Sequence, residues 1–446
     1  MKKVLLFAAA AMIAACTPKV NLEQVPAPDW YVHEGTFAER NSMMETLPLN
    51  AQSKVFFGDN IASQGDWRLF FNDTTIVNRA IPMEWSGEAL YRIDQIAKYK
   101  PASIFVSVGY WDLCAKDADG KYRSDAKTAI ANCKEIMERA AAISPATRLY
   151  YLSVVPNARL DAERTADVQK VNEAMKEGAG KYVYVDITSN LVDANGVLKT
   201  EFTPDGNMLN GKAYEDIANT LAEHIGSKSL LKVDSVYSTN HGAYYDLRVT
   251  NFASVPHQER PVVLLGDSLT DDTEWEEFIP LVNILNMGIS GDTVEGMKER
   301  VDIIAPQQPI MVFIMAGIND FTSSSSLSAV KLYEKYSELI QKIKEKCPLS
   351  QIIVQSTLPM NPIHPHYEGV NERVAELNKL LAAAAPLQRY VFLDVASAVT
   401  DEEGNLKADF TTDGCHLNAE GYYTWATKIV SSGLFIGVNA FQSENK

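Results

Sequence analysis

The chain repeats a set of landmarks at one constant separation, and this repeat limits the possible folds more than any other feature. The segment KVFFGDN at Lys54 is similar to VVLLGDS at Val262, so Asn60 and Ser268 stand 208 residues apart (268 − 60). The same separation joins these pairs: Trp67 with Trp275, Asn78 with Asn286, Gly109 with Gly317, Asp112 with Asp320, Asp186 with Asp394, and Asp205 with Asp413. It changes only around VVPN and TLPM, as loops of a duplicated fold tolerate. We therefore predict two copies of one domain.

Chain length agrees with two domains. At 446 residues, the chain exceeds what a single hydrophobic core usually supports. We place the first copy at 54–227 and the second at 260–443, with lead-ins at 16–53 and 228–259. The first lead-in contains several prolines and little hydrophobic periodicity, which is typical of a tether followed by irregular structure.

Each copy alternates short apolar segments with amphipathic ones. In the second copy the expected strands are VVLLG, VNILNMG, IMVFIMAG, QIIVQSTLP and YVFLDV. Residues 328–346 and 371–385 have apolar side chains at three- and four-residue spacing, which predicts helices. This alternation predicts an α/β fold in which helices cover both faces of a parallel sheet.

Residues 1–15 have the layout of a secretory signal peptide. Lys2 and Lys3 precede an apolar stretch that is too short to span a bilayer comfortably. The segment IAAC, which ends at Cys16, resembles the lipobox of bacterial lipoproteins, and this resemblance implies lipidation of Cys16 after cleavage. A plain signal peptide is the alternative. We expect an exported, membrane-anchored bacterial lipoprotein that faces the periplasm or the cell surface and is held by its lipid alone.

Charge and cysteine content exclude some partners. The formal net charge is −16 and no dense cluster of Lys and Arg occurs, so we expect no nucleic-acid partner. Four cysteines follow Cys16, without the spacing of a metal site. Of these, Cys114 and Cys133 could form a disulfide in an exported protein. Neither the bridge nor the oligomeric state can be decided from the sequence.

Ser268 follows an apolar segment that stops at Gly266, and the ends of parallel strands are where α/β sheets bind ligands. Alone, such a serine is more often a turn residue or helix cap. Asp413 and His416, however, supply an acid and an imidazole three residues apart. A serine hydroxyl needs a base, and an aspartate on the same face of a helical turn could orient that base. We predict Ser268, Asp413 and His416 as catalytic residues.

The second copy resembles the GDSL or SGNH hydrolase superfamily in four ordered blocks. These are GDSL at 266–269, NMGISGDT at 286–293, AGIND at 316–320 and DGCHLN at 413–418. The resemblance implies a flavodoxin-like three-layer α/β/α fold, with the acetylhydrolase and carbohydrate-esterase branches most similar. It also implies an oxyanion hole formed by the backbone N–H groups of Ser268 and Gly291 and the side-chain amide of Asn319. No cofactor is expected.

Other polar residues near these blocks have structural interpretations. We predict that Asp267, Asp292 and Asp320 accept hydrogen bonds from backbone N–H groups in their loops. His364 and His366 lie in the proline-rich segment PMNPIHPHYEG without a third ligand. We therefore expect a loop that lines the substrate site, with no metal.

The first copy keeps the pattern but not the chemistry. Asn60 stands at the nucleophile position, and Met83, Trp111 and Met208 stand at the oxyanion glycine, the oxyanion asparagine and the base, respectively. Only the acid, Asp205, is present. We predict that this copy does not hydrolyse esters. Whether it is a scaffold or a binding module depends on whether its site is open or filled by its own side chains.

The leading functional hypothesis is a serine esterase that forms an acyl-enzyme on Ser268. The family resemblance and the exported setting favour short acyl groups, particularly O-acetyl esters on carbohydrates. A lipid or lysophospholipid acyl esterase is the alternative. A lipoprotein that binds a glycan or a partner without catalysis is an alternative of another class.

Overall fold

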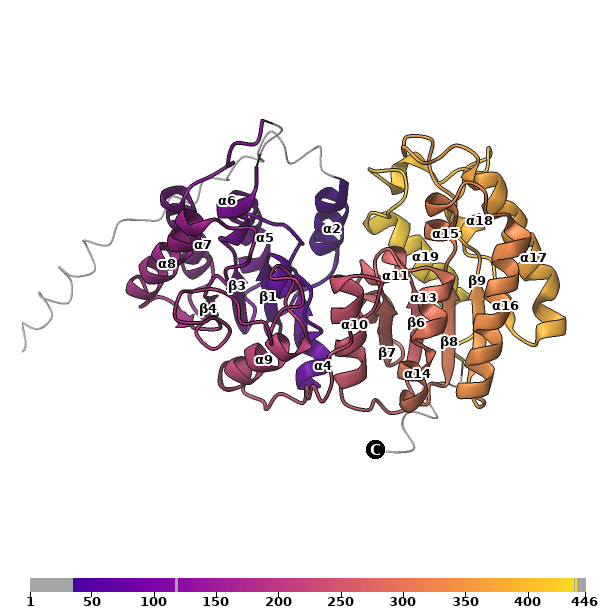
Figure 1. Ribbon diagram of the computed structural model, residues 1–446, viewed down its shortest axis with the longest axis horizontal. Helices are drawn as coiled ribbons and strands as arrows, with labels where there is room; N and C mark the ends of the chain where they lie inside the picture. Colours follow the sequence, from indigo (N-terminus) through magenta and orange to yellow (C-terminus); the bar gives the residue numbers. More distant parts are fainter. Residues whose placement is uncertain (1–34, 117–118, 437, 439–446) are drawn as a thin grey trace, which may run out of the picture.

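The computed structural model describes residues 35–116, 119–436 and 438, so the predicted signal peptide and Cys16 lie outside the described residues. Two α/β units lie side by side, each built on a five-stranded parallel sheet (Figure 1). The first half contains β1 (Lys54–Gly58), β2 (Ile76–Asn78), β3 (Ser103–Ser107), β4 (Arg148–Leu152) and β5 (Val183–Val185). The second half contains β6 (Val262–Gly266), β7 (Ile284–Gly288), β8 (Met311–Met315), β9 (Gln351–Gln355) and β10 (Val391–Leu393).

The two sheets have the same topology. Their strand orders are β2-β1-β3-β4-β5 and β7-β6-β8-β9-β10, and all strand pairs are parallel. Counted within each half, both orders read 2-1-3-4-5, which is the flavodoxin-like arrangement. In β6, all five residues are buried because helices cover both sides of this central strand. The predicted α/β fold with parallel sheets is confirmed.

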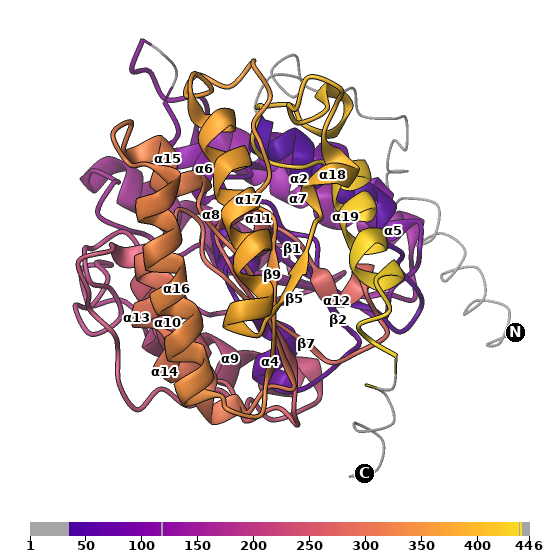
Figure 2. The same ribbon diagram turned by 90° about the vertical axis from the view of Figure 1, so that its right-hand side faces the viewer.

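Helices form the outer layers. In the second half, α13 (Val294–Glu299), α16 (Ala329–Lys346) and α17 (Val370–Gln388) cover one face, and α12 (Trp275–Phe278) and α19 (Ala419–Ser431) cover the other (Figure 2). In the first half, α5 (Ser86–Ala97), α7 (Ala126–Ile143) and α8 (Ala162–Glu177) lie opposite α4 (Trp67–Phe71) and α9 (Gly211–Ile225). Short helices follow several strands: α3 (Asn60–Ser63), α6 (Tyr110–Cys114), α11 (Ser268–Asp271), α15 (Ile318–Ser323) and α18 (Ala396–Val399). No helix in the described residues is both long and apolar enough to cross a bilayer.

The predicted irregular lead-ins each contain a helix, which corrects the sequence analysis. These are α2 (Gly35–Thr46) and α10 (Ala243–Ser254), whose bounds are also 208 residues apart (243 − 35). Each packs against the opposite half: α2 lies against α19, and α10 lies against α9 (Figure 1). Met43 joins the second-half core and Leu247 joins the first-half core. Val249 and Phe252 of α10 also join the second-half core, so the apolar residues of this helix are divided between two cores.

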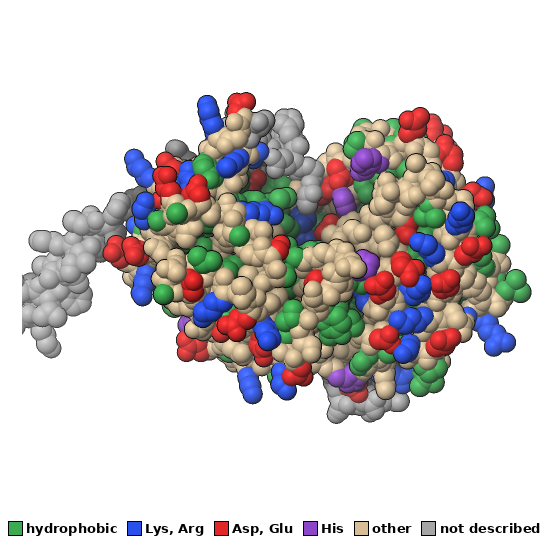
Figure 3. Space-filling view, viewed as in Figure 1, with side chains coloured by type: hydrophobic (Ala, Val, Ile, Leu, Met, Phe, Trp, Pro, Cys, Tyr) green, Lys and Arg blue, Asp and Glu red, His purple; other side chains and the backbone are tan. Residues whose placement is uncertain are grey.

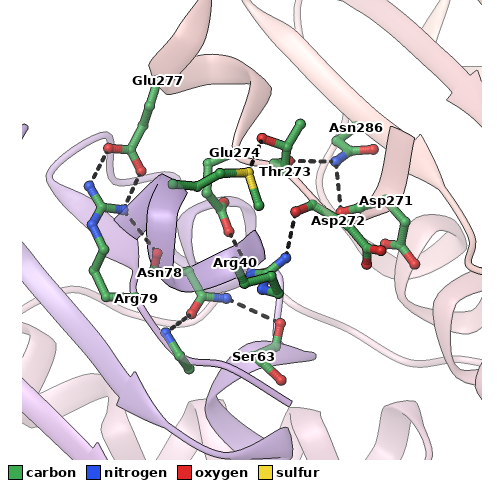
Figure 4. Close-up of polar contacts among 12 residues, drawn as sticks. Arg40, Ser63, Asn78, Arg79, Asp271, Asp272, Thr273, Glu274, Glu277 and Asn286 are labelled. Atoms are coloured by element: carbon green, nitrogen blue, oxygen red, sulfur yellow. Dashed lines mark hydrogen bonds and ion pairs between the residues drawn. The ribbon is translucent and has the colours of Figure 1, made fainter. Parts of the chain in front are cut away.

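Ion pairs link the two halves in equivalent positions. Arg40 of α2 approaches Glu274 at 3.5 Å (Figure 4). Arg248 of α10 approaches Asp66 at 2.9 Å. Both the arginines and the acids of these pairs are 208 residues apart (248 − 40 and 274 − 66). The contact is therefore made twice, in opposite directions, and the exchange of helices between the halves is reciprocal.

The four cysteines in the described residues are free, so the possible bridge between Cys114 and Cys133 does not form. Cys133 is fully buried on α7, where its Sγ lies 3.9 Å from the carbonyl oxygen of Val108 and 3.7 Å from the hydroxyl of Tyr151. The thiol is part of the core packing, while Cys114 ends α6.

Candidate active site

Ser268 stands where β6 turns into α11. Asp267 caps this helix by accepting the N–H of Leu269 at 3.1 Å, as predicted. Gly266 permits the turn, because a Cβ there would lie 2.0 Å from Oγ1 of Thr270. The tight connection places Ser268 at the carboxyl edge of the central strand, with 7% of its surface exposed.

A chain of hydrogen bonds joins the three residues predicted to be catalytic. The Oγ of Ser268 lies 3.0 Å from Nε2 of His416, and Nδ1 of His416 lies 2.6 Å from Oδ2 of Asp413. The other carboxylate oxygen of Asp413 accepts the N–H groups of Cys415 and His416, each at 2.8 Å. Asp413 and His416 lie in a loop before α19, whereas a helical turn was expected from the sequence. The difference arises because the Asp413 side chain itself closes the loop.

The electrostatic environment favours an ionised Asp413 beside a protonated His416. Burial alone would lower the pKa of His416, but the hydrogen bond to Asp413 and the charges of Asp272, Asp413 and Glu39 outweigh it and raise that pKa to about 9. Burial opposes ionisation of Asp413 too, yet the hydrogen bond and charge of His416 and two backbone N–H groups hold the pKa of Asp413 well below its usual range. Asp413 therefore stays ionised and can stabilise an imidazolium.

The predicted oxyanion-hole residues line the same cleft as Ser268 and His416. Gly291 follows β7 with φ at +82°, and a Cβ at this position would meet nothing within 4 Å. Asn319 lies in α15, and its Nδ2 donates to the carbonyl oxygen of Asp292 at 3.0 Å. This bond orients the carboxamide and leaves its second N–H available.

Buried polar contacts hold these loops, and the sequence analysis identified only some of them. Asp320 accepts the N–H of Val294 at 3.1 Å, and Asp292 accepts the N–H of Thr293 at 2.8 Å, so the predicted structural roles are confirmed. Arg300, which was missed, pairs with Asp292 at 2.8 Å. Its guanidinium also donates to the carbonyl oxygens of Met287 and Gly266 at 2.6 and 3.0 Å, which ties the ends of β7 and β6 together.

At the corresponding place in the first half, the site is closed by its own side chain. The Oδ1 of Asn60 accepts the backbone N–H of Met83 at 2.8 Å and the Nε1–H of Trp111 at 2.6 Å. Met83 has φ at +65°, close to the conformation of Gly291. Met83 and Trp111, which stand at the positions of the predicted oxyanion donors, thus both donate to one oxygen atom of Asn60. The pocket beside Asn60 has a volume of only about 110 Å³.

A larger cleft of about 590 Å³ lies between the two halves and opens on Ser268. The second half contributes Asp272, Glu276 and Asn286, and the first half contributes Gln64 and Arg68. Sequence analysis had assigned the site to the second copy alone. The sequence does contain a signal for a contact between the halves. Arg40 recurs as Arg248, and Asp66 recurs as Glu274, 208 residues later.

Two other predictions concern the surroundings of this cleft. His364 and His366 are not among the residues that line it, although the backbone of His364 packs against Gly414 in the loop between Asp413 and His416. Acidic and basic side chains are intermingled over the visible face of both halves, without a continuous basic patch (Figure 3).

Glu39 of α2 was also missed, and it reaches the catalytic loop from outside the second half. Burial, with the nearby charge of Asp413, raises the pKa of Glu39 to about 7, although hydrogen bonds from Thr412 oppose this rise. Glu39, Asp413 and His416 each offer one atom that could bind a metal ion, and these three atoms lie within 4.8 Å of one another. Asp413 and His416 already use these groups to bind each other, so a metal ion would compete with the hydrogen bond between them.

The sequence profile of the family described as GDSL-like lipase/acylhydrolase matches residues 264–423. The second half of this chain belongs to that family. The match contains Ser268, Gly291, Asn319, Asp413 and His416, and it supports a hydrolase that acts on esters. It does not extend to β1–β5, so the common origin of the two halves remains a prediction from the repeat.

Individual proteins similar to this chain include one curated relative. The N-acylneuraminate cytidylyltransferase of Escherichia coli O18:K1:H7 is 28% identical over 200 residues, which are 44% of this chain and 44% of that protein. The chain thus spans less than half of the relative's length.

The solved structures that are similar to part of this chain have lower sequence identity. A GDSL-like lipase from Bacteroides thetaiotaomicron is 22% identical, with a TM-score of 0.38 over 42% of this chain and 96% of its own. A carbohydrate acetylesterase from Sinorhizobium meliloti is 20% identical, with a TM-score of 0.34 over 39% of this chain and 98% of its own.

Proposed function

We propose that this protein is a serine esterase that removes short acyl groups, in particular O-acetyl groups, from carbohydrates. The observation that carries the proposal is the hydrogen-bonded chain from Ser268 through His416 to Asp413, which opens on a cleft that Gly291 and Asn319 also line. A hydroxyl, a base, an ionised acid and oxyanion donors are the components that acyl transfer requires.

In the proposed reaction, His416 takes the proton of Ser268 as its Oγ attacks the ester carbonyl carbon. The backbone N–H groups of Ser268 and Gly291 and the Asn319 amide stabilise the resulting oxyanion. His416 then gives its proton to the leaving alcohol, which leaves an acyl-enzyme on Ser268. A water molecule, deprotonated by the same His416, attacks this ester and releases the acid. The convergence of Met83 and Trp111 on Asn60 supports the assignment of Gly291 and Asn319 as donors.

The lining of the cleft favours a hydroxylated substrate over a lipid. It contains amide and charged groups such as Gln64, Arg68 and Glu276. A long acyl chain would leave these groups without hydrogen bonds, whereas sugar hydroxyls can pair with them. Carboxylates outnumber guanidinium groups around the cleft, which disfavours a phosphate head group.

One experiment tests the chemistry. Wild-type protein and Ser268→Ala are incubated with a chromogenic acetate ester and, separately, with a serine-reactive fluorophosphonate. The wild type should turn over the ester and gain the mass of one probe, and the variant should do neither. If the wild type shows no turnover and no labelling, the proposed function is wrong. A series from acetate to longer acyl esters then distinguishes a sugar acetylesterase from a lipid esterase.

Two parts of the proposal concern the rest of the chain. We propose that the first half is a non-catalytic scaffold that forms one wall of the cleft, since Asn60 already occupies its oxyanion-like donors. We also propose export and a lipid anchor on Cys16, without a nucleic-acid partner. Mass spectrometry of membrane-fractionated protein, with Cys16→Ala as the control, tests the anchor.

A further inference from the structure

Glu39 lies in α2, ahead of β1 in the chain, yet it contacts the loop that carries Asp413. Its side chain is 2% exposed. The Oε1 atom accepts the N–H of Thr412 at 2.9 Å, the hydroxyl of Thr412 at 2.7 Å and the N–H of Asp413 at 3.2 Å. Three donors of the catalytic loop therefore converge on one oxygen from a distant part of the sequence.

The helix that carries Glu39 is firmly docked on the second half. Arg40 donates to the carbonyl oxygen of Asp272 at 2.7 Å, and Ser42 accepts the N–H of Ala419 at 3.0 Å. Met43 is 1% exposed in the second-half core. These contacts fix the position of α2 and therefore of Glu39. The hydrogen bonds between Glu39 and the loop can thus restrain the loop.

The loop is held from two sides. The Asp413 carboxylate accepts the N–H groups of Cys415 and His416. Glu39 accepts the N–H groups of Thr412 and Asp413. Without Glu39, these two N–H groups would lose this acceptor, and the loop would have to shift to recover one. The 2.6 Å bond from Asp413 to His416 depends on the position of this backbone.

We propose that Glu39 is a positioning residue for the esterase reaction, which fixes the Thr412–Asp413 backbone so that Asp413 remains aligned with His416. The inference rests on the proposed function, because it assigns Glu39 to the same catalytic site. It also means that the first lead-in completes this site.

Glu39 has a second, electrostatic effect that can be measured separately. The carboxylates that face His416 are Asp413 and Asp272 from the second half and Glu39 from α2, with Asp267 next to Ser268. His364 is the neighbouring base. An ionised Glu39 stabilises the imidazolium, so loss of its charge should lower the pKa of His416.

Two substitutions separate the hydrogen bonds from the charge. Glu39→Gln keeps an oxygen acceptor and removes the charge, whereas Glu39→Ala removes both. We expect Glu39→Ala to lower kcat for the chromogenic acetate by about 10- to 100-fold with little change in KM, because misalignment affects the chemical step. Glu39→Gln should restore most of the kcat. In both variants, kcat/KM should begin to rise at lower pH, and an NMR titration of the His416 ring should show a lower pKa.

A control comes from the same helix. Glu45→Ala removes an equal charge at an exposed position. It should change neither kcat nor the His416 titration. An unchanged kcat and titration in Glu39→Ala, or an equal loss in Glu45→Ala, would overturn the inference. If Glu39→Ala does not fold, Glu39→Gln must still lower the pKa of His416, and an unchanged pKa overturns the inference.

The two proposals can fail separately. A wild type that is inactive towards esters and fluorophosphonates refutes the proposed function, while the His416 titration, which needs no turnover, still tests Glu39.

Discussion

The contact between Arg79 and Glu277 offers a quantitative test of how the two halves are joined. The Arg79 side chain is completely buried, and its guanidinium contacts both carboxylate oxygens of Glu277 at 2.7 and 2.6 Å (Figure 4). Arg79 comes from the residue after β2 and Glu277 from α12, so the pair crosses the interface between the halves. Removal of one partner leaves a largely buried charge without compensation.

The substitution Arg79→Met keeps an unbranched apolar stem but removes the guanidinium group and its charge. We expect it to lower the free energy of unfolding by about 3–5 kcal/mol, the usual cost of a single broken partner in a buried pair. Replacement of both partners, as in Arg79→Met with Glu277→Leu, should recover most of this loss because no uncompensated charge remains. The difference between the single and double variants measures the penalty of the isolated carboxylate.

Denaturant unfolding, followed by tryptophan fluorescence and circular dichroism, measures these free energies. Two probes are needed because two halves can unfold in separate steps. Lys232→Met is the control, since Lys232 pairs with Asp234 on the exposed surface. A loss below about 1 kcal/mol for Arg79→Met, or a double variant as unstable as the single one, would refute the reasoning.

Three further predictions concern the active site. Because the pKa of His416 is raised to about 9 and only neutral imidazole can accept the serine proton, kcat/KM should rise with pH and level off above that value. A profile already flat above about pH 6.5 would contradict the raised pKa. Asn319→Ala should lower kcat by about 100- to 1,000-fold with an unchanged melting temperature, as measured by steady-state assay and thermal unfolding. A loss under tenfold would argue against its role as a donor. Asn60→Ala should leave turnover of the small acetate within about twofold, and a larger loss would show that the first-half site takes part.

Local patterns predicted the fold of the second half well. The apolar segment before Ser268 identified a central strand, and the spacing of the four blocks identified residues that the fold then brings together. Such features can be found because strand ends and their loops are encoded by nearby residues. The loop of Asp413 and His416 was expected to be helical, since a side chain that caps its own loop produces the same spacing as a helical turn.

The elements that the sequence analysis missed depend on distant contacts. α10 divides its apolar residues between two cores, and α2 places Met43 in the core of the other half, so the burial of both helices depends on contacts that the local sequence does not encode. The cleft depends on how the halves meet, and that arrangement rests on buried pairs such as Arg248 with Asp66. Glu39 gave no local signal because its partners, Thr412 and Asp413, lie at the other end of the chain.

The exchange of α2 and α10 has a consequence for the order of assembly during synthesis. α2 is among the first described elements to leave the ribosome, whereas its partner α19 is the last of the described helices to be made. The early helix must therefore wait, without its final neighbour, until the second half has been synthesised. The Glu39 contact with Thr412 spans 373 residues and closes only at that point. The loop of Thr412 and Asp413 is thus completed late, because the helix that holds it is made long before the loop itself.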